Sequence, residues 1–357
     1  MSKRRITGIC LAILTCAICA TGANAALKDG TYETQAMGNN GHVVFKTTIR
    51  DGKIASIEVL KSEETPLLGQ GALEKLSKAI VEQQTLKIDV VSGASNSSRA
   101  ILKAVGEALA KAGGSEADLK PVKVKTSDKA ILQDATTDVL VIGAGGSGMA
   151  AAIEATNQGA KVILIEKQPN VGGTTLFSTT SFTAGGSKQQ MAAPKPFTAE
   201  DFYKKLLVEF PGAESPNLKQ LAERSGPTID WLINLGADLT KVINNSQHVS
   251  PSGKALGTIV VPTLKKEVDR LGIDTRTQTK AVDLITKDGK VIGAVVETPQ
   301  GKYKIFADSV ILSTGGFASN PELVAKYTPQ WAGYPSTASR GSTGDGLLMG
   351  MKVGGAI

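Results

Sequence analysis

Cysteine is nearly absent from this sequence. The three that occur, Cys10, Cys16 and Cys19, all lie close to the start of a chain of 357 residues. Cys16 and Cys19 have the spacing of a redox motif, but a mature chain that begins after them contains no thiol at all. We therefore expect no disulfide, no metal site and, because no Cys-x-x-Cys-His run occurs, no c-type haem attachment.

Aromatic residues are also scarce, at 4% of the chain, and no block of Lys and Arg occurs beyond the first few residues. The formal net charge is +7, of which Lys3, Arg4 and Arg5 supply three positive charges. Both features argue against nucleic acid as a partner. With 41% hydrophobic and 20% charged residues, the chain is typical of a globular protein and long enough for two domains.

The chain has no long apolar run except near its start. Three basic residues precede an apolar stretch at 6–20, which ends in the small residues Ala23 and Ala25 around Asn24. This pattern predicts a signal peptide over residues 1–25, and hence a periplasmic or otherwise exported protein. The run is shorter than the roughly 20 apolar residues that a spanning helix requires, so we expect no membrane anchor.

Residues 27–113 have the pattern of a small α+β domain. Apolar and polar residues alternate at 43–49 and 54–59 on both sides of Asp51-Gly52, which predicts an antiparallel hairpin. Helices are predicted over 71–84 and 97–112, the second of them stopped by two glycines. Residues 114–134 are rich in charged residues and read as a linker.

Residues 135–357 have a different pattern. The unbroken apolar runs at 137–142 and 162–165 are typical of strands that are buried on both faces of a parallel sheet. A helix is predicted between them, at 149–158. This βαβ unit predicts a Rossmann-like α/β domain.

A dinucleotide-binding motif follows the first of these strands. Gly143 permits a tight turn, Gly145 lets a pyrophosphate approach the backbone, and Gly148 lets helix and sheet pack closely. Glu166 ends the second strand, where a carboxylate can bind the ribose hydroxyls of an adenine nucleotide and disfavours NADP. Together these residues predict a site for a dinucleotide cofactor.

A serine-rich segment at 89–98 leads into the second helix of the first domain. A hydroxyl at a helix start can cap the free backbone N–H groups, and the same helix start can bind a phosphate. The residues alone leave both interpretations open.

The whole of residues 29–113 resembles the FMN-binding domain of sodium-pumping quinone reductases and electron-transport complexes. The resemblance rests on the sequences at 29–32 (Asp-Gly-Thr-Tyr), 64–69 (Glu-Thr-Pro-Leu-Leu-Gly) and 89–95. It implies that a flavin transferase attaches FMN covalently, through a phosphodiester bond, to the hydroxyl of Ser95. That family more often has Thr at this position.

Residues 137–357 resemble the flavoproteins of the fumarate reductase and succinate dehydrogenase family. The matching stretches lie at 166–178, 184–186, 236–239, 271–274, 313–317 and 344–346, and the departure is a Ser/Thr-rich run at 178–183. The resemblance implies non-covalent FAD. The residues expected to bind it are Gly143, Gly145, Ser147, Gly148, Glu166, Lys167, Gly173, Thr174, Thr175, Ala281, Val282, Thr314, Gly315 and Asp345.

The catalytic residues of that family follow the Gly-Asp-Gly stretch at 344–346. This sequence ends at Ile357, so we expect a C-terminally truncated, incomplete FAD-binding domain that is inactive by itself, and we assign no catalytic residue. His248, the single histidine of this region, is predicted to be structural or adjacent to the cofactor. His42 is expected at the surface.

The resemblance implies a reductase of a small α,β-unsaturated carboxylate, which passes electrons from FMN to FAD to substrate. The expected partners are that substrate, a flavin transferase and an upstream electron donor such as a quinol-linked cytochrome or another redox protein. Two alternatives remain open: an electron-transfer protein without substrate turnover, and a related FAD-dependent dehydrogenase or oxidase.

Overall fold

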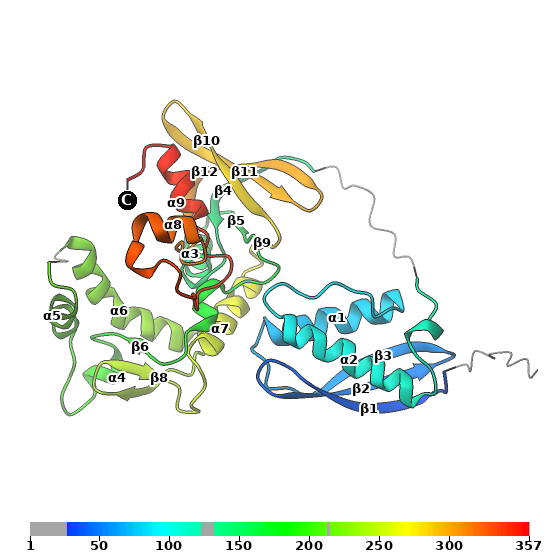
Figure 1. The fold of residues 1–357 in the computed structure, drawn as a ribbon. Helices are drawn as coiled ribbons and strands as arrows, with labels where there is room; N and C mark the ends of the chain where they lie inside the picture. Colours follow the sequence, from blue (N-terminus) through cyan, green and yellow to red (C-terminus); the bar gives the residue numbers. More distant parts are fainter. Residues whose placement is uncertain (1–26, 123–131, 213–214, 357) are drawn as a thin grey trace, which may run out of the picture.

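The computed structural model describes residues 27–122, 132–212 and 215–356. The predicted signal peptide at 1–25 lies outside these residues, as do residues 123–131 of the predicted linker. Figure 1 shows a first unit, residues 27–122, and a second unit, residues 132–356. Within the described part of the chain, no helix has the length and apolar character needed to cross a membrane.

The first unit contains a three-stranded antiparallel sheet, and its strands β1 (Gly30–Met37), β2 (His42–Arg50) and β3 (Lys53–Lys61) pair in chain order. The turn between β2 and β3 is made by Asp51 and Gly52, both with positive φ (52° and 68°). Positive φ at both turn residues matches the twist of a two-residue hairpin and explains the choice of Asp-Gly. The predicted hairpin is confirmed.

Two helices, α1 (Gly69–Gln83) and α2 (Ser95–Lys111), pack on one face of this sheet. Along β2, Val43, Phe45 and Ile49 are buried against them, as the alternation predicted. Each helix begins two residues earlier than expected. After the short helix η1 (Glu116–Asp118), Leu119 also packs in this core, so the start of the predicted linker is part of the first unit.

The second unit is built on a six-stranded mixed sheet with the order β10-β11-β12-β4-β5-β9. Strands β12, β4, β5 and β9 are parallel, whereas β10, β11 and β12 are antiparallel. The strands are β4 (Ala135–Ile142), β5 (Val162–Ile165), β9 (Asp274–Arg276), β10 (Lys280–Lys287), β11 (Lys290–Thr298) and β12 (Gly301–Leu312).

Both faces of the central strands are covered. Val141 and Leu164 pack with α3 (Gly146–Asn157) and α7 (Gly257–Arg270). Leu140 and Ile163 point the other way and pack with residues of β10, β11 and β12 and with Met349 of α9 (Asp345–Lys352). Burial on both faces explains why β4 and β5 are continuous apolar runs, and the predicted βαβ unit is confirmed.

The other elements of the second unit lie between β5 and α7 or after β12. A small sheet has the order β6-β8-β7, and helices α5 and α6 pack beside it in a minor core around Phe202. The bounds are η2 (Gly173–Phe177), β6 (Phe182–Thr183), α4 (Lys188–Met191), α5 (Ala199–Glu209), α6 (Pro216–Asn234), β7 (Lys241–Ile243), β8 (Gln247–Val249), α8 (Pro321–Tyr327) and η3 (Pro329–Trp331).

Candidate functional site

The glycine-rich turn between β4 and α3 lies at the carboxyl end of the parallel strands, where open α/β sheets bind ligands. A methyl group on Gly148 would lie 1.8 Å from the Gly143 carbonyl oxygen, and one on Gly143 would lie 2.5 Å from the Ser313 carbonyl oxygen. On Gly145, the nearest atom would be 4.0 Å away. Two of these glycines are therefore required by packing, and the third leaves the backbone open to a ligand.

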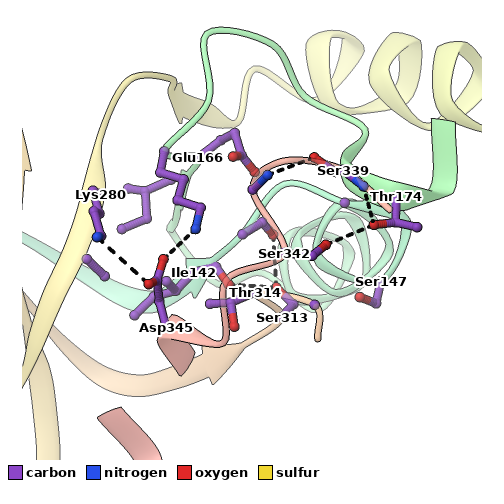
Figure 2. A pocket seen from close by; sticks show the side chains of 18 of the residues that line it. Ile142, Ser147, Glu166, Thr174, Lys280, Ser313, Thr314, Ser339, Ser342 and Asp345 are labelled. Atoms are coloured by element: carbon purple, nitrogen blue, oxygen red, sulfur yellow. Dashed lines mark hydrogen bonds and ion pairs between the residues drawn. The ribbon is translucent and has the colours of Figure 1, made fainter. Parts of the chain in front are cut away.

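Glu166 directly follows β5, and its side chain contacts the glycine-rich turn that follows β4. Its carboxylate accepts hydrogen bonds from the backbone N–H groups of Ala144 (3.0 Å) and Gln168 (2.8 Å). Burial raises the pKa of the Glu166 carboxyl above its ordinary value, while those two amides and the charge of Lys167 lower it. The carboxylate has acceptor capacity beyond these two bonds, and it lines the cavity beside the turn (Figure 2).

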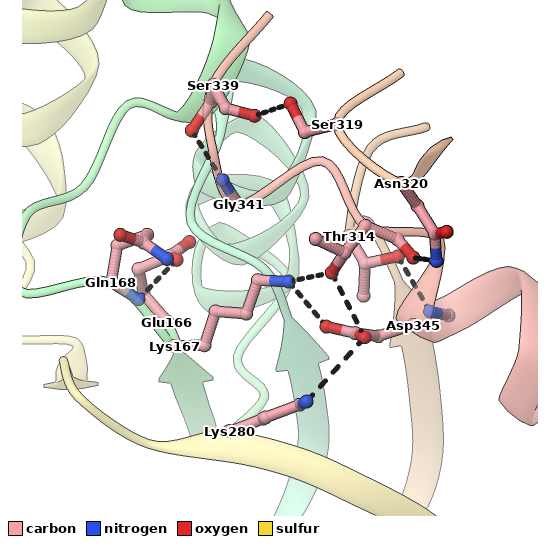
Figure 3. Close-up of polar contacts among 12 residues, drawn as sticks. Glu166, Lys167, Gln168, Lys280, Thr314, Ser319, Asn320, Ser339, Gly341 and Asp345 are labelled. Carbon is pink, nitrogen blue, oxygen red and sulfur yellow. Dashed lines mark hydrogen bonds and ion pairs between the residues drawn. The ribbon is translucent and has the colours of Figure 1, made fainter. Parts of the chain in front are cut away.

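An ion-pair network forms another side of the same cavity. Lys167 Nζ lies 2.5 Å from Asp345 Oδ2 and 2.6 Å from Thr343 Oγ1, and Lys280 Nζ lies 3.8 Å from Asp345 Oδ1 (Figure 3). The Lys167 and Asp345 side chains are each only 20% exposed. Asp345 begins α9, where the helix dipole favours a negative charge. The network therefore places two cations beside the cavity, balanced by one carboxylate.

Most of the residues predicted to bind FAD line this one cavity. Those that do so are Gly143, Gly145, Ser147, Glu166, Lys167, Gly173, Thr174, Thr175, Ala281, Thr314, Gly315 and Asp345. Gly148 lies beneath the turn, Val282 is not among the lining residues, and Ser95 belongs to the other unit. We refer to this cavity as the dinucleotide cradle.

Sequence reasoning missed several residues of the cradle. They come from three segments distant in the chain: Thr279 and Lys280 at the start of β10, Ser313 after β12, and Ser339, Gly341 and Ser342 before α9. Thr174 of η2 contacts the third of these segments, because its hydroxyl lies 3.0 Å from Ser342 Oγ and accepts from the Ser339 N–H (3.2 Å) (Figure 2). Ser313 could have been predicted because it directly follows a strand of the sheet, but the loop before α9 has no comparable sequence pattern.

His248 lies outside the cradle, on β8. It is fully buried, with Nδ1 2.9 Å from the Leu239 carbonyl oxygen and Nε2 2.9 Å from Ser187 Oγ. Burial lowers the pKa of its imidazole below the ordinary value of 6.5, outweighing the Leu239 carbonyl and the charge of Asp230, which raise it. Both ring nitrogens are used in the fold, which fits the structural interpretation.

The serine-rich segment of the first unit forms the start of α2. The N-cap residue is Ala94, which makes no side-chain capping bond, and Ser95 is the first helical residue. Ser97 is buried and donates to the Glu64 carboxylate, and Ser98 is buried between the Val91 N–H and the Ala94 carbonyl. Ser95 does not act as the cap of this helix, and its half-buried side chain lines a cavity at the edge of the unit.

Glu64 holds the other wall of that cavity in place. The side chain is 3% exposed, and its Oε1 accepts from the backbone N–H groups of Asn39 (2.6 Å) and Asn40 (3.0 Å). Through the bond from Ser97 the same carboxylate also reaches α2. Glu64 therefore fixes the loop after β1 against the start of α2, beside Ser95.

A Rossmann-like sheet with a glycine turn and an acidic strand end defines a protein class that binds flavin or nicotinamide dinucleotides. Residues 138–357 match the model of the FAD binding domain family, and residues 38–110 match that of the FMN-binding domain. The chain belongs to the FAD-binding fumarate reductase family of flavoproteins and carries an FMN-binding domain before its FAD-binding domain.

Similar proteins include reductases. The chain is 38% identical over 247 residues to the fumarate reductase (cytochrome) of Shewanella frigidimarina, covering 66% of this chain and 43% of that protein. It is 31% identical over 353 residues to the urocanate reductase of Eggerthella lenta, covering 94% and 57%. The chain thus spans about half the length of these relatives.

The open conformation of a flavocytochrome c3 fumarate reductase has a similar fold. The TM-score is 0.58 at 36% sequence identity, over 62% of this chain and 41% of that one.

The residues present fit the two flavins that these families imply. At the cradle, the open side of Gly145 admits a pyrophosphate beside the first turn of α3, whose N–H groups lack intrahelical acceptors. The free space within the cradle is about 120 Å³, and it adjoins a second cavity of about 260 Å³ that shares Gly173 and Ser339 with it. In the first unit, an accessible hydroxyl at a helix N-terminus suits a phosphate ester.

Proposed function

We propose that this protein is a flavin-dependent reductase of α,β-unsaturated carboxylates, with FAD bound non-covalently in the cradle and FMN esterified to Ser95. Electrons pass from FMN to FAD and then to the substrate. One observation supports this most: a single chain contains two separate sites suited to flavin phosphates, each within a segment that matches a flavin-binding family. The relatives named as reductases of fumarate and urocanate supply the substrate class.

FAD, when bound, supplies hydride chemistry for a carbon–carbon double bond conjugated to a carboxylate. The chain's own residues bind and orient it. The N–H groups at the start of α3 contact the pyrophosphate, Glu166 accepts from the ribose hydroxyls, and Thr174 and Thr175 continue the contact along the diphosphate. Lys167 and Lys280 add positive charge beside these anionic groups.

A covalent link at Ser95 is consistent with export to the periplasm and requires a flavin transferase as a partner. A protein exported to the periplasm cannot replace a flavin that dissociates, since free flavin there is dilute, and an ester bond removes that loss. A flavin transferase would form the bond, and an upstream donor such as a quinol-linked cytochrome or another redox protein would reduce the FMN. A second flavin site favours a donor protein over oxygen, and thus a reductase over an oxidase.

The first prediction concerns the FMN ester. Co-expression with a flavin transferase is expected to increase the mass of the protein by that of FMN less one water, because Ser95 presents its hydroxyl at the helix start for a phosphodiester bond. Ser95→Ala abolishes the increase and Ser95→Thr retains it. The control Ser92→Ala changes an exposed serine of the same loop and keeps the modification. An unchanged mass in the wild type, or full modification of Ser95→Ala, contradicts the proposal.

The second prediction concerns substrate reduction. The product of the complete reading frame, loaded with both flavins, is expected to oxidise a reduced dye when fumarate, urocanate or acrylate is added. Gly148→Ala loses FAD and this activity, since its methyl group would lie 1.8 Å from the Gly143 oxygen. Gly350→Ala, at a helical glycine with 3.8 Å of space, keeps both. A flavin-replete protein that reduces none of these acids contradicts the proposal and leaves the two alternatives, an electron-transfer protein and a related dehydrogenase or oxidase.

A further inference from the structure

A large cavity lies between the two units and contains Ser95. Its volume is about 790 Å³, within the range of small-molecule sites. The first unit contributes Ser95, Asn96 and Arg99, and the second contributes Phe177, Ser178 and Arg340. A group attached to the Ser95 hydroxyl therefore faces residues of both units. We call this space the inter-unit cavity.

Two arginines of the inter-unit cavity suit a phosphate ester. Arg99 follows Ser95 by four residues on α2, so both side chains lie on one face of the helix. Arg340 lines the cavity from the other unit. Among the described residues, the arginine ion pairs belong to Arg270 and Arg276, so neither cavity arginine has a carboxylate partner there.

The apolar wall of the inter-unit cavity suits an aromatic ring. Phe177 is 42% exposed although its neighbour Leu176 is buried. Both line the cavity, together with Leu68 from the first unit. An exposed aromatic side chain beside leucines provides a surface on which a flat aromatic ring can pack.

A third cavity shares lining residues with the inter-unit cavity and with the dinucleotide cradle. The cavity of about 260 Å³ that adjoins the cradle also shares Leu68, Phe177 and Arg340 with the inter-unit cavity. The short helix η2 separates the two sites, because Thr174 and Thr175 line the cradle and Phe177 lines the inter-unit cavity. A ring in the inter-unit cavity would therefore lie one helical turn from the cradle.

We infer that the inter-unit cavity binds the FMN carried by Ser95, so that the flavin is held by both units. Arg99 and the first N–H groups of α2 contact its phosphate. Phe177 packs against its ring, and Arg340 contacts its polar edge. This inference rests on the proposed modification of Ser95, and it adds that the FAD-binding unit supplies half of the FMN site.

Hydrogen exchange measured by mass spectrometry tests the inference on the full chain loaded with FAD. The wild-type protein and Ser95→Ala are both produced with a flavin transferase and then compared. We expect slower exchange in the flavinylated protein at the start of α2 and also at 173–179 and 339–342 of the second unit. Helix α5 serves as the internal control and keeps its exchange rate.

The outcomes separate the two claims. A wild-type protein without the mass of FMN overturns the modification, and the inter-unit site with it. A modified protein whose added protection is confined to the first unit overturns the inter-unit site alone and leaves the modification standing.

Variants of the second unit give an independent test. In flavinylated protein with equal FAD content, we expect Phe177→Ala and Arg340→Gln each to increase roughly twofold the quenching of FMN fluorescence by neutral acrylamide, because pockets bury most of their ligand's surface. The matched controls are the exposed Phe210→Ala and Arg224→Gln, remote from the cavity, which leave quenching unchanged. Unchanged quenching in both cavity variants contradicts the inference.

Discussion

The two histidines of the chain occupy opposite environments. His42 begins β2 and is exposed, whereas His248 is fully buried with a partner at each ring nitrogen. Because the Leu239 carbonyl can only accept, the proton of the neutral imidazole belongs on Nδ1, and Nε2 accepts from Ser187. Protonation of Nε2 would leave the Ser187 hydroxyl hydrogen without its acceptor. The buried site therefore favours the neutral form.

A pH-dependent stability follows from this environment. The folded-state pKa of His248 lies below 6.5, so as pH falls from about 6.5 the unfolded chain binds a proton that the folded chain does not. The free energy of unfolding then decreases toward lower pH, and above pH 6.5 this contribution is fully present.

His248→Asn is expected to remove this part of the pH dependence. It should also lower stability by about 1–3 kcal/mol at neutral pH, since one buried partner loses its hydrogen bond. Urea unfolding between pH 5 and 8 measures both effects, with His42→Asn as the exposed control. If the free energy of unfolding of His248→Asn still decreases below pH 6.5 as steeply as that of the wild type, His248 is not the source of this pH dependence.

Three neighbouring serines show how far single residues could be interpreted from sequence. Ser95, Ser97 and Ser98 have the same chemistry, and capping or phosphate binding suited any of them. The structure separates them because Ser97 and Ser98 are buried and hydrogen-bonded, whereas Ser95 faces a cavity. That distinction depends on Glu64, a residue 31 positions before Ser95 in a loop whose approach to α2 no local pattern predicts.

At the scale of elements, periodicity predicted the fold well. Alternation in β2 and the continuous apolar runs of β4 and β5 follow directly from burial on one face or on both. Helix starts were less accurate, because α2 has no side-chain cap to mark its beginning. Its first turn is therefore defined by packing and not by a local signal.

The dinucleotide cradle shows which site residues local sequence patterns cannot predict. Its glycines and Glu166 were predictable because they follow strands in a known spacing, whereas the η2 threonines were expected from the family resemblance. The loop residues Ser339, Gly341 and Ser342 were not, since they reach the cradle through contacts with Thr174. The Ser/Thr-rich run at 178–183, where the sequence departs from the family, begins with Ser178 and Thr179, which line the inter-unit cavity. Contacts between distant segments cannot be derived from local patterns.

At the scale of the whole molecule, each unit has its own hydrophobic core. Phe45, Leu73 and Ile101 belong to the core of the first unit, and Val141 and Leu164 to one core of the second. Leu68 packs against a core of each unit. Units with separate cores and limited contact unfold as separate cooperative transitions.

Calorimetry on the chain without FMN is therefore expected to show two transitions, and FAD should raise only the one that belongs to the second unit. At a hundredfold excess over its Kd, FAD adds about 2.7 kcal/mol, or roughly 5 to 10 °C for a unit of this size. Gly148→Ala abolishes the shift and Gly350→Ala retains it, since only the first methyl group clashes with the backbone of the turn that forms the cradle. A single transition that moves as a whole would show that the two cores unfold together. After flavinylation of Ser95 the two transitions should move closer, because the contacts of a flavin held by both units are lost when either one unfolds.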